Sequence, residues 1–243
     1  MSIYVCVYSL SYPYLFSWLN IFSNVYHLYF KSKKPRSCLD LSASGFLCIQ
    51  DNNGVFYKVY CDLASEPGWA WTLVMSQSML KRAEPFTQSS FSLNHPMNVR
   101  APNWEAYRLP LARMEELRSQ STHWRITCSF PSSGVDYRDY VRAEFAKFDL
   151  LTFQGSKACK EVDYINVRGH DCGHCTSAWW QNANYGNFLV HVSSVKGCEL
   201  GASPNFGGPH EHNFGRYRQY LNPDHRCTSD DSATTNYWFG GPI

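Results

Sequence analysis

The sequence lacks the motifs that mark most enzyme active sites. Its 243 residues contain no Gly-x-Ser-x-Gly nucleophile elbow, no His-Glu-x-x-His helix and no glycine-rich phosphate loop. The adjacent acids Glu115 and Glu116 lie in a segment with helical periodicity, where they fit a solvated helix face. The sequence therefore predicts a non-catalytic protein.

The chain also lacks a large excess of charge of either sign. Twenty-two Lys and Arg against 20 Asp and Glu give a formal net charge of +2. No Lys/Arg cluster lies among aromatic residues in the way that nucleic-acid binding requires, so we expect no nucleic-acid partner. Asn-x-Ser/Thr sequons are absent as well, and glycosylation therefore says nothing about secretion.

Residues 3–30 contain no Asp, Glu, Lys or Arg and are long enough to cross a bilayer. Pro13, His27 and several tyrosines make the segment less apolar than an ordinary span, and the positive n-region of a signal peptide is missing. The basic residues in 31–36 would place the rest of the chain in the cytoplasm. An atypical signal or anchor, a mis-annotated start and a soluble aromatic extension all stay open. We assign residues 1–36 to an extension outside the fold and leave membrane association open.

The chain is rich in cysteine and in aromatic residues, with ten cysteines and 16% aromatic residues. In a reducing compartment so many cysteines would be metal ligands or a liability, whereas in a secreted protein they form disulfides. We therefore expect a secreted or extracellular protein, with a membrane-anchored form as the alternative. The chain is long enough to bury a substantial core, and without internal repeats residues 37–243 form one continuous domain in the simplest interpretation.

Residues 46–74 predict a β-hairpin and a further strand. Apolar residues in or near alternation flank Asn53-Gly54, the dipeptide that most often forms a two-residue hairpin turn, because both residues tolerate positive φ. The run from Val55 to Cys61 is then the second strand of the hairpin, and Trp71 to Val74 begins the next strand.

This segment resembles the opening of the fibrinogen C-terminal-like domain. The similar features are a Ser-Cys start at Ser37-Cys38, the hairpin, the sequence Tyr-Lys-Val-Tyr-Cys-Asp that ends at Asp62, and Trp-Thr-Leu-Val from Trp71. The resemblance implies that Cys38 and Cys61 form the first disulfide of the domain, and the hairpin brings Cys61 within reach of Cys38.

Downstream patterns follow in the order of the same family. Residues 75–103 predict a loop, Pro110 begins a short amphipathic helix, and Trp124 to Phe130 predicts a strand. A turn at 131–135 and an extended pair at 137–151 follow. Similar family motifs are Trp-Arg-Ile from Trp124 and the aromatic-rich residues 142–148, so the resemblance covers residues 37–151. It implies an α+β fold of disulfide-stapled antiparallel sheets with short helices and long loops.

The second half departs from the family pattern, because the Asp-x-Asp calcium loop of fibrinogen-like domains is missing. Asp224, Asp230 and Asp231 with loop carbonyl groups are the alternative calcium ligands, since calcium takes six to eight oxygen ligands. The competing interpretation is that these aspartates are turn and cap residues in a solvated loop.

Cys172-Gly173-His174-Cys175 is the motif that suggests another class of function. A redox Cys-x-x-Cys places its first cysteine at a helix N-terminus, and residues 176–181 could begin such a helix. Asp171 opposes thiolate formation, and no βαβ pattern surrounds the motif. Zinc is the other interpretation, with His170 and His174 as further ligands. A thiol-disulfide oxidoreductase or zinc-binding protein centred on Cys172 and Cys175 is therefore the alternative function.

The other cysteines are paired by plausibility, since sequence does not determine connectivity. Cys198 with Cys227 would close a loop rich in Gly, Pro and Asn, and Cys128 would meet Cys159 if their strands are neighbours. Cys172 and Cys175 pair locally or stay free. Cys6 and Cys48 have no obvious partner.

Aromatic, amide and arginine side chains crowd the segment from Asn213 to the C-terminal end, on loops rich in glycine. Such side chains suit stacking on sugar rings or a protein interface, and they also suit an ordinary core, in which Tyr237 to Phe239 form a last strand. The candidate ligand-binding residues are Tyr217, Tyr220, His225, Tyr237 and Trp238. The resemblance implies an extracellular recognition or adhesion module for glycans, acetylated groups or protein partners, with self-association left open.

Overall fold

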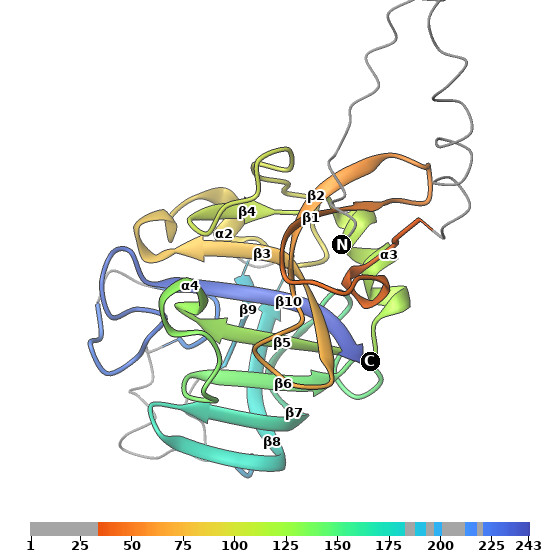
Figure 1. Cartoon of the computed structure of the whole chain (residues 1–243). Helices are drawn as coiled ribbons and strands as arrows, with labels where there is room; N and C mark the ends of the chain where they lie inside the picture. Colours follow the sequence, from red (N-terminus) through yellow and green to blue (C-terminus); the bar gives the residue numbers. More distant parts are fainter. Residues whose placement is uncertain (1–33, 183–187, 193–196, 201–211, 218–220) are drawn as a thin grey trace, which may run out of the picture.

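The computed structural model describes residues 34–182, 188–192, 197–200, 212–217 and 221–243 (Figure 1). Within these residues the chain forms one continuous antiparallel sheet, in the order β1-β2-β3-β10-β5-β6-β7-β8-β9, with the short β4 paired to β3. The strands are β1 (Gly45–Gln50), β2 (Phe56–Asp62), β3 (Trp69–Ser78), β4 (Ala106–Arg108), β5 (His123–Cys128), β6 (Tyr140–Glu144), β7 (Gly155–Val167), β8 (His170–Asn182), β9 (Phe188–Val192) and β10 (Thr234–Pro242).

Helices are few and short. The α-helices are α2 (Pro85–Gln88), α3 (Leu111–Gln120) and α4 (Phe130–Ser133), and the 3-10 helices are η1 (Cys38–Asp40) and η2 (Met79–Lys81). Strands make up 42% of the structure and helices 13%. The expected α+β, fibrinogen C-terminal-like architecture is therefore corrected to a strand-rich antiparallel fold in which α3 is the one described helix longer than four residues.

The Asn53-Gly54 hairpin is confirmed, but its turn is longer than two residues. Gln50 pairs with Phe56, and the Asp51 carboxylate accepts hydrogen bonds from the backbone N–H groups of Asn53 and Val55. Gly54 has φ +79°, where a side chain would be strained. The carboxylate of Asp51 thus replaces the partners that a two-residue turn would supply from the backbone.

The last strand lies in the middle of the sheet. β10, blue in Figure 1, runs between β3 and β5 and pairs with both. Tyr237, Trp238 and Phe239 are completely buried there. At Gly240 an added Cβ would lie 2.0 Å from the carbonyl oxygen of Ala70, so only glycine fits. The strand expected at 237–239 is confirmed and extends over Thr234–Pro242.

Several local expectations hold and others fail. The helix after Pro110 and the strand around Trp124 are confirmed as α3 and β5. The turn expected at 131–135 contains the short helix α4 instead, and the expected extended pair at 137–151 yields one strand, β6. The helix considered for 176–181 is wrong, because these residues belong to the 13-residue strand β8.

Four disulfides join described cysteines: Cys38–Cys61, Cys128–Cys227, Cys159–Cys198 and Cys172–Cys175. The first pairing is confirmed. The pairings Cys198–Cys227 and Cys128–Cys159 are wrong, because Cys128 is bonded to Cys227 and Cys159 to Cys198. β6 lies between β5 and β7 and separates Cys128 from Cys159. Cys48 is also disulfide-bonded, and Cys6 lies outside the described residues.

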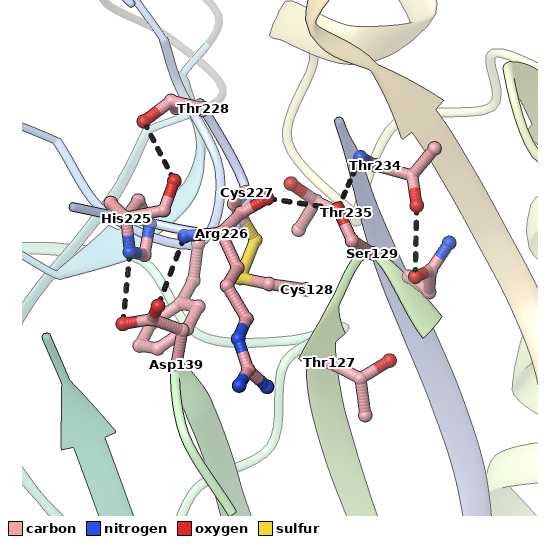
Figure 2. Close-up of a disulfide and its surroundings, with 12 residues drawn as sticks. Thr127, Cys128, Ser129, Asp139, His225, Arg226, Cys227, Thr228, Thr234 and Thr235 are labelled. Carbon is pink, nitrogen blue, oxygen red and sulfur yellow. Dashed lines mark hydrogen bonds and ion pairs between the residues drawn. A yellow bond between two sulfur atoms is a disulfide. The ribbon is translucent and has the colours of Figure 1, made fainter. Parts of the chain in front are cut away.

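A buried acid–histidine pair lies beside the Cys128–Cys227 disulfide. Figure 2 shows His225 and the backbone N–H of Arg226 directed at the carboxylate of Asp139. His225 Nδ1 lies 3.1 Å from Asp139 Oδ1, and both side chains are about 1% exposed or less. Burial alone would raise the pKa of Asp139, but His225 and the backbone N–H groups of Arg226 and Arg168 hold that pKa below 3.8. The pair fixes the 221–228 loop to the start of β6.

Peptide mapping without reduction tests the disulfides. Digestion of the oxidised protein should yield one linked pair of peptides containing Cys128 and Cys227 and another containing Cys159 and Cys198, because the fold puts these cysteines together. A peptide pair linking Cys198 to Cys227 would contradict the sheet order.

The variant Asp139→Asn should lose about 3 kcal/mol of stability at pH 7, because it leaves His225 buried without its anionic partner. A lowered carboxylate pKa stabilises the fold above pH 3.8 and loses that contribution as pH falls through the folded-state value. The difference between wild type and variant in urea unfolding should therefore shrink below pH 4. Asp136→Asn, which breaks a half-exposed pair with Arg226, should cost less than about 1 kcal/mol. Equal losses in the two variants would contradict this assignment.

Candidate binding surface

The aromatic residues expected to bind ligand lie in the core. Tyr237 and Trp238 are completely buried, and their polar atoms are hydrogen-bonded to Phe214 O and Thr127 Oγ1. Tyr217 is 8% exposed and bonds Thr235. His225 is held by Asp139, as described above, and Tyr220 lies outside the described residues. The four described side chains therefore stabilise the core and present no open face to a ligand.

The aspartates expected to bind calcium lie in the loop before β10. Asp230 accepts hydrogen bonds from the backbone and hydroxyl of Ser232, as an ordinary turn residue does. Among the described residues, the groups that bring three ligand atoms within 4.8 Å of one another do not include Asp224, Asp230 or Asp231. Calcium binding there stays a prediction.

Cys172 and Cys175 lie within the strand β8 and are bonded to each other. A reactive dithiol draws its low thiol pKa from a helix N-terminus, and this strand offers none. Because both sulfurs are in the disulfide, neither is a thiolate ligand for zinc with His170 or His174. The arrangement therefore gives no support to the oxidoreductase or zinc interpretation of this motif.

A surface pocket of about 630 Å³ lies at a different place, between η2, α2 and the segment that leads into β4. Its apolar walls come from Phe86, Met97, Trp104 and Ala106. Its polar rim comes from Lys81, Glu84, Asn98, Asn103 and Glu105. Ligand sites commonly combine a mainly apolar lining with a few polar groups in this way.

One buried arginine holds the pocket together. Arg108, on β4, is completely buried and donates four hydrogen bonds, to the carbonyl oxygens of Phe86, Ser89, Ser90 and Leu93. These carbonyl groups belong to the α2 segment, which forms one wall. Burial lowers the pKa of Arg108 to about 10, so the guanidinium keeps its charge at neutral pH.

Asn103 shapes the opposite wall. Its Oδ1 accepts hydrogen bonds from the backbone N–H groups of Glu105 and Ala106, and its Nδ2 donates to Ala106 O. Asn98 Nδ2 donates to the same carbonyl oxygen. This tight loop holds the half-buried indole of Trp104 at the pocket edge.

Trp104 is also the centre of an aromatic row on the surface. Its ring lies 4.8 Å from that of Tyr60 and 6.1 Å from that of Phe46, measured between centroids. Phe46 is 39% exposed, and the ammonium of Lys58 lies 5.2 Å from its centroid. Trp104 thus belongs both to the pocket lining and to the aromatic row, and its ring also packs on the buried rings of Phe130 and Trp238, 5.7 and 6.2 Å away between centroids.

Sequence reasoning missed this surface because it placed ligand binding in the second half of the chain. Residues 75–103 were expected to form a loop, but they contain the end of β3, η2 and α2. A signal was present in Asn103-Trp104-Glu105, since a tryptophan among polar loop residues needs either burial or a ligand. The aromatic row itself has no local signal, because Phe46 and Tyr60 meet Trp104 only through the sheet.

No family model matches the chain, and no curated protein matches it. The described helices include none that is long and apolar enough to span a bilayer. The hydrophobic segment at residues 3–30, considered for that role, lies outside the described residues.

Replacing Arg108 should loosen the pocket. Arg108→Lys keeps the charge but loses the planar fork that reaches four carbonyl groups, so we expect a loss of about 2 kcal/mol in chemical denaturation. Arg100→Lys, at an exposed position, is the control and should leave stability within about 0.5 kcal/mol. An unchanged unfolding midpoint for Arg108→Lys would contradict the anchoring role.

Proposed function

We propose that this protein is a non-catalytic extracellular recognition module that binds glycans, including acetylated ones, through the pocket at Trp104. The observation that carries the proposal is the joint surface of pocket and aromatic row, with an indole at its centre and amide, carboxylate and ammonium groups on the rim. A protein partner that offers an aromatic or acylated side chain would use the same surface.

The chemistry of the pocket supports a sugar ligand. The apolar face of a pyranose ring stacks on an indole, while its hydroxyl groups need hydrogen-bond partners around the ring. Glu84 and Lys81 lie 3.9 Å apart on the rim and offer an acceptor and a donor. The apolar walls at Phe86 and Met97 suit a methyl group, as in an N-acetyl substituent.

The extracellular setting is supported by the disulfides. Four disulfides among the described residues fit a protein that folds in an oxidising compartment.

A glycan array, probed with and without calcium, tests this proposal. For any glycan bound, Trp104→Ala should weaken affinity at least tenfold, about 1.4 kcal/mol, because the stacking platform is lost. Tyr137→Ala is the matched control, since Tyr137 is a 42% exposed aromatic that does not line the pocket. Binding that is unaffected by Trp104→Ala, or lost equally in both variants, would place the ligand elsewhere.

A further inference from the structure

Three potential metal ligands meet where β5, β6 and β7 run side by side. His123 is the first residue of β5, Glu144 is the last residue of β6 and pairs with it directly, and Asp163 lies on β7. One ligand atom from each lies within 4.8 Å of the other two. The site is on the surface of the molecule but not freely solvated, since the side chain of Asp163 is 8% exposed and that of His123 is 16% exposed.

The separation of the ligand atoms fits a small ion. His123 Nε2 lies 3.3 Å from Asp163 Oδ2. Two ligands about 2.0–2.1 Å from a tetrahedral zinc ion are about 3.3 Å apart, so an ion can lie between these atoms with little movement. Glu144 is 40% exposed and can turn toward the same point.

The histidine ring is held in the orientation that a metal needs. Its Nδ1 lies 2.8 Å from the hydroxyl of Thr122, and its ring packs against the edge of Trp69 at 4.8 Å between centroids. Metal-binding histidines commonly have such a partner on the second nitrogen, because it fixes both the tautomer and the ring. With the Nδ1 proton directed at Thr122, the Nε2 lone pair faces Asp163.

Two cations already contact these carboxylates. Arg142 Nε lies 3.6 Å from Asp163 Oδ2, and Lys147 Nζ lies 3.8 Å from Glu144 Oε1. Arg142 also contacts Glu66 and Lys147 also contacts Glu161, so each cation keeps a second carboxylate partner when an ion binds.

We propose that His123, Glu144 and Asp163 bind a zinc ion, with a fourth position open to water or to a ligand. A nitrogen donor and two carboxylates suit zinc, whereas calcium requires six to eight oxygen ligands. Lys147 gives up its contact with Glu144 and keeps its 2.5 Å contact with Glu161. This site is independent of the pocket at Trp104.

Metal titration of tag-free, EDTA-treated protein tests the proposal. Calorimetry with zinc chloride at pH 7.5 should give one site that His123→Ala weakens at least 100-fold and Glu144→Gln about tenfold. His170→Ala removes a histidine from the start of β8 and should change nothing. Cobalt(II) should give the visible absorption of a four-coordinate ion in wild type and lose it in His123→Ala.

The result that overturns the proposal is a folded wild-type protein that takes up no zinc, or uptake that is unchanged in His123→Ala. Circular dichroism checks the fold of each variant. If His123→Ala does not fold, Glu144→Gln decides, because this exposed side chain can be changed without emptying the core. Uptake lost in His170→Ala would assign the ion to β8 and also overturn the proposal.

Discussion

The buried ion pairs of Arg125 are the interaction on which the rest of this fold depends. Arg125 lies on β5, is completely buried, and binds the carboxylates of Asp62 and Glu66 from the connection between β2 and β3. Its guanidinium lies 4.8 Å from the ring centroids of both Trp71 and Trp238. Removing one partner from a buried pair costs about 3–5 kcal/mol, because the other charge stays desolvated. This one side chain therefore ties the hairpin end of the sheet to its centre.

Further charged side chains on the neighbouring strands β6 and β7 join these ion pairs. Glu66 also accepts hydrogen bonds from Tyr140 and Arg142, and Arg142 lies 3.6 Å from Asp163. The ion pairs that hold this connection in place thus continue through Arg142 on β6 to Asp163 on β7. The apolar pocket at Trp104 lies on a different segment, where Arg108 binds the carbonyl oxygens of the α2 segment.

Local sequence signals predicted local structure well. Asn53-Gly54 specified a hairpin, Pro110 a helix start, and the aromatic run at Tyr237 a strand, because each depends on neighbours along the chain. The disulfides of Cys128 and Cys159 could not be predicted, since they depend on β6 lying between β5 and β7. The aromatic row at Trp104 was not predicted for the same reason, because Trp104 contacts Phe46 and Tyr60 only in the folded chain. The aromatic residues Tyr237 and Trp238, which were predicted to bind ligand, fill the core.

Because β10 lies in the middle of the sheet, the sheet stays open until the end of the chain has been synthesised. All the strands that flank β10 are translated earlier, so the facing edges of β3 and β5 have no partner until Thr234–Pro242 leaves the ribosome. Unpaired edges bind other strands readily, including those of a neighbouring nascent chain. The disulfide between Cys128 and Cys227 holds the segment just ahead of β10 against β5. Oxidation at this point would shorten the interval during which the open sheet is exposed to chaperones and aggregation.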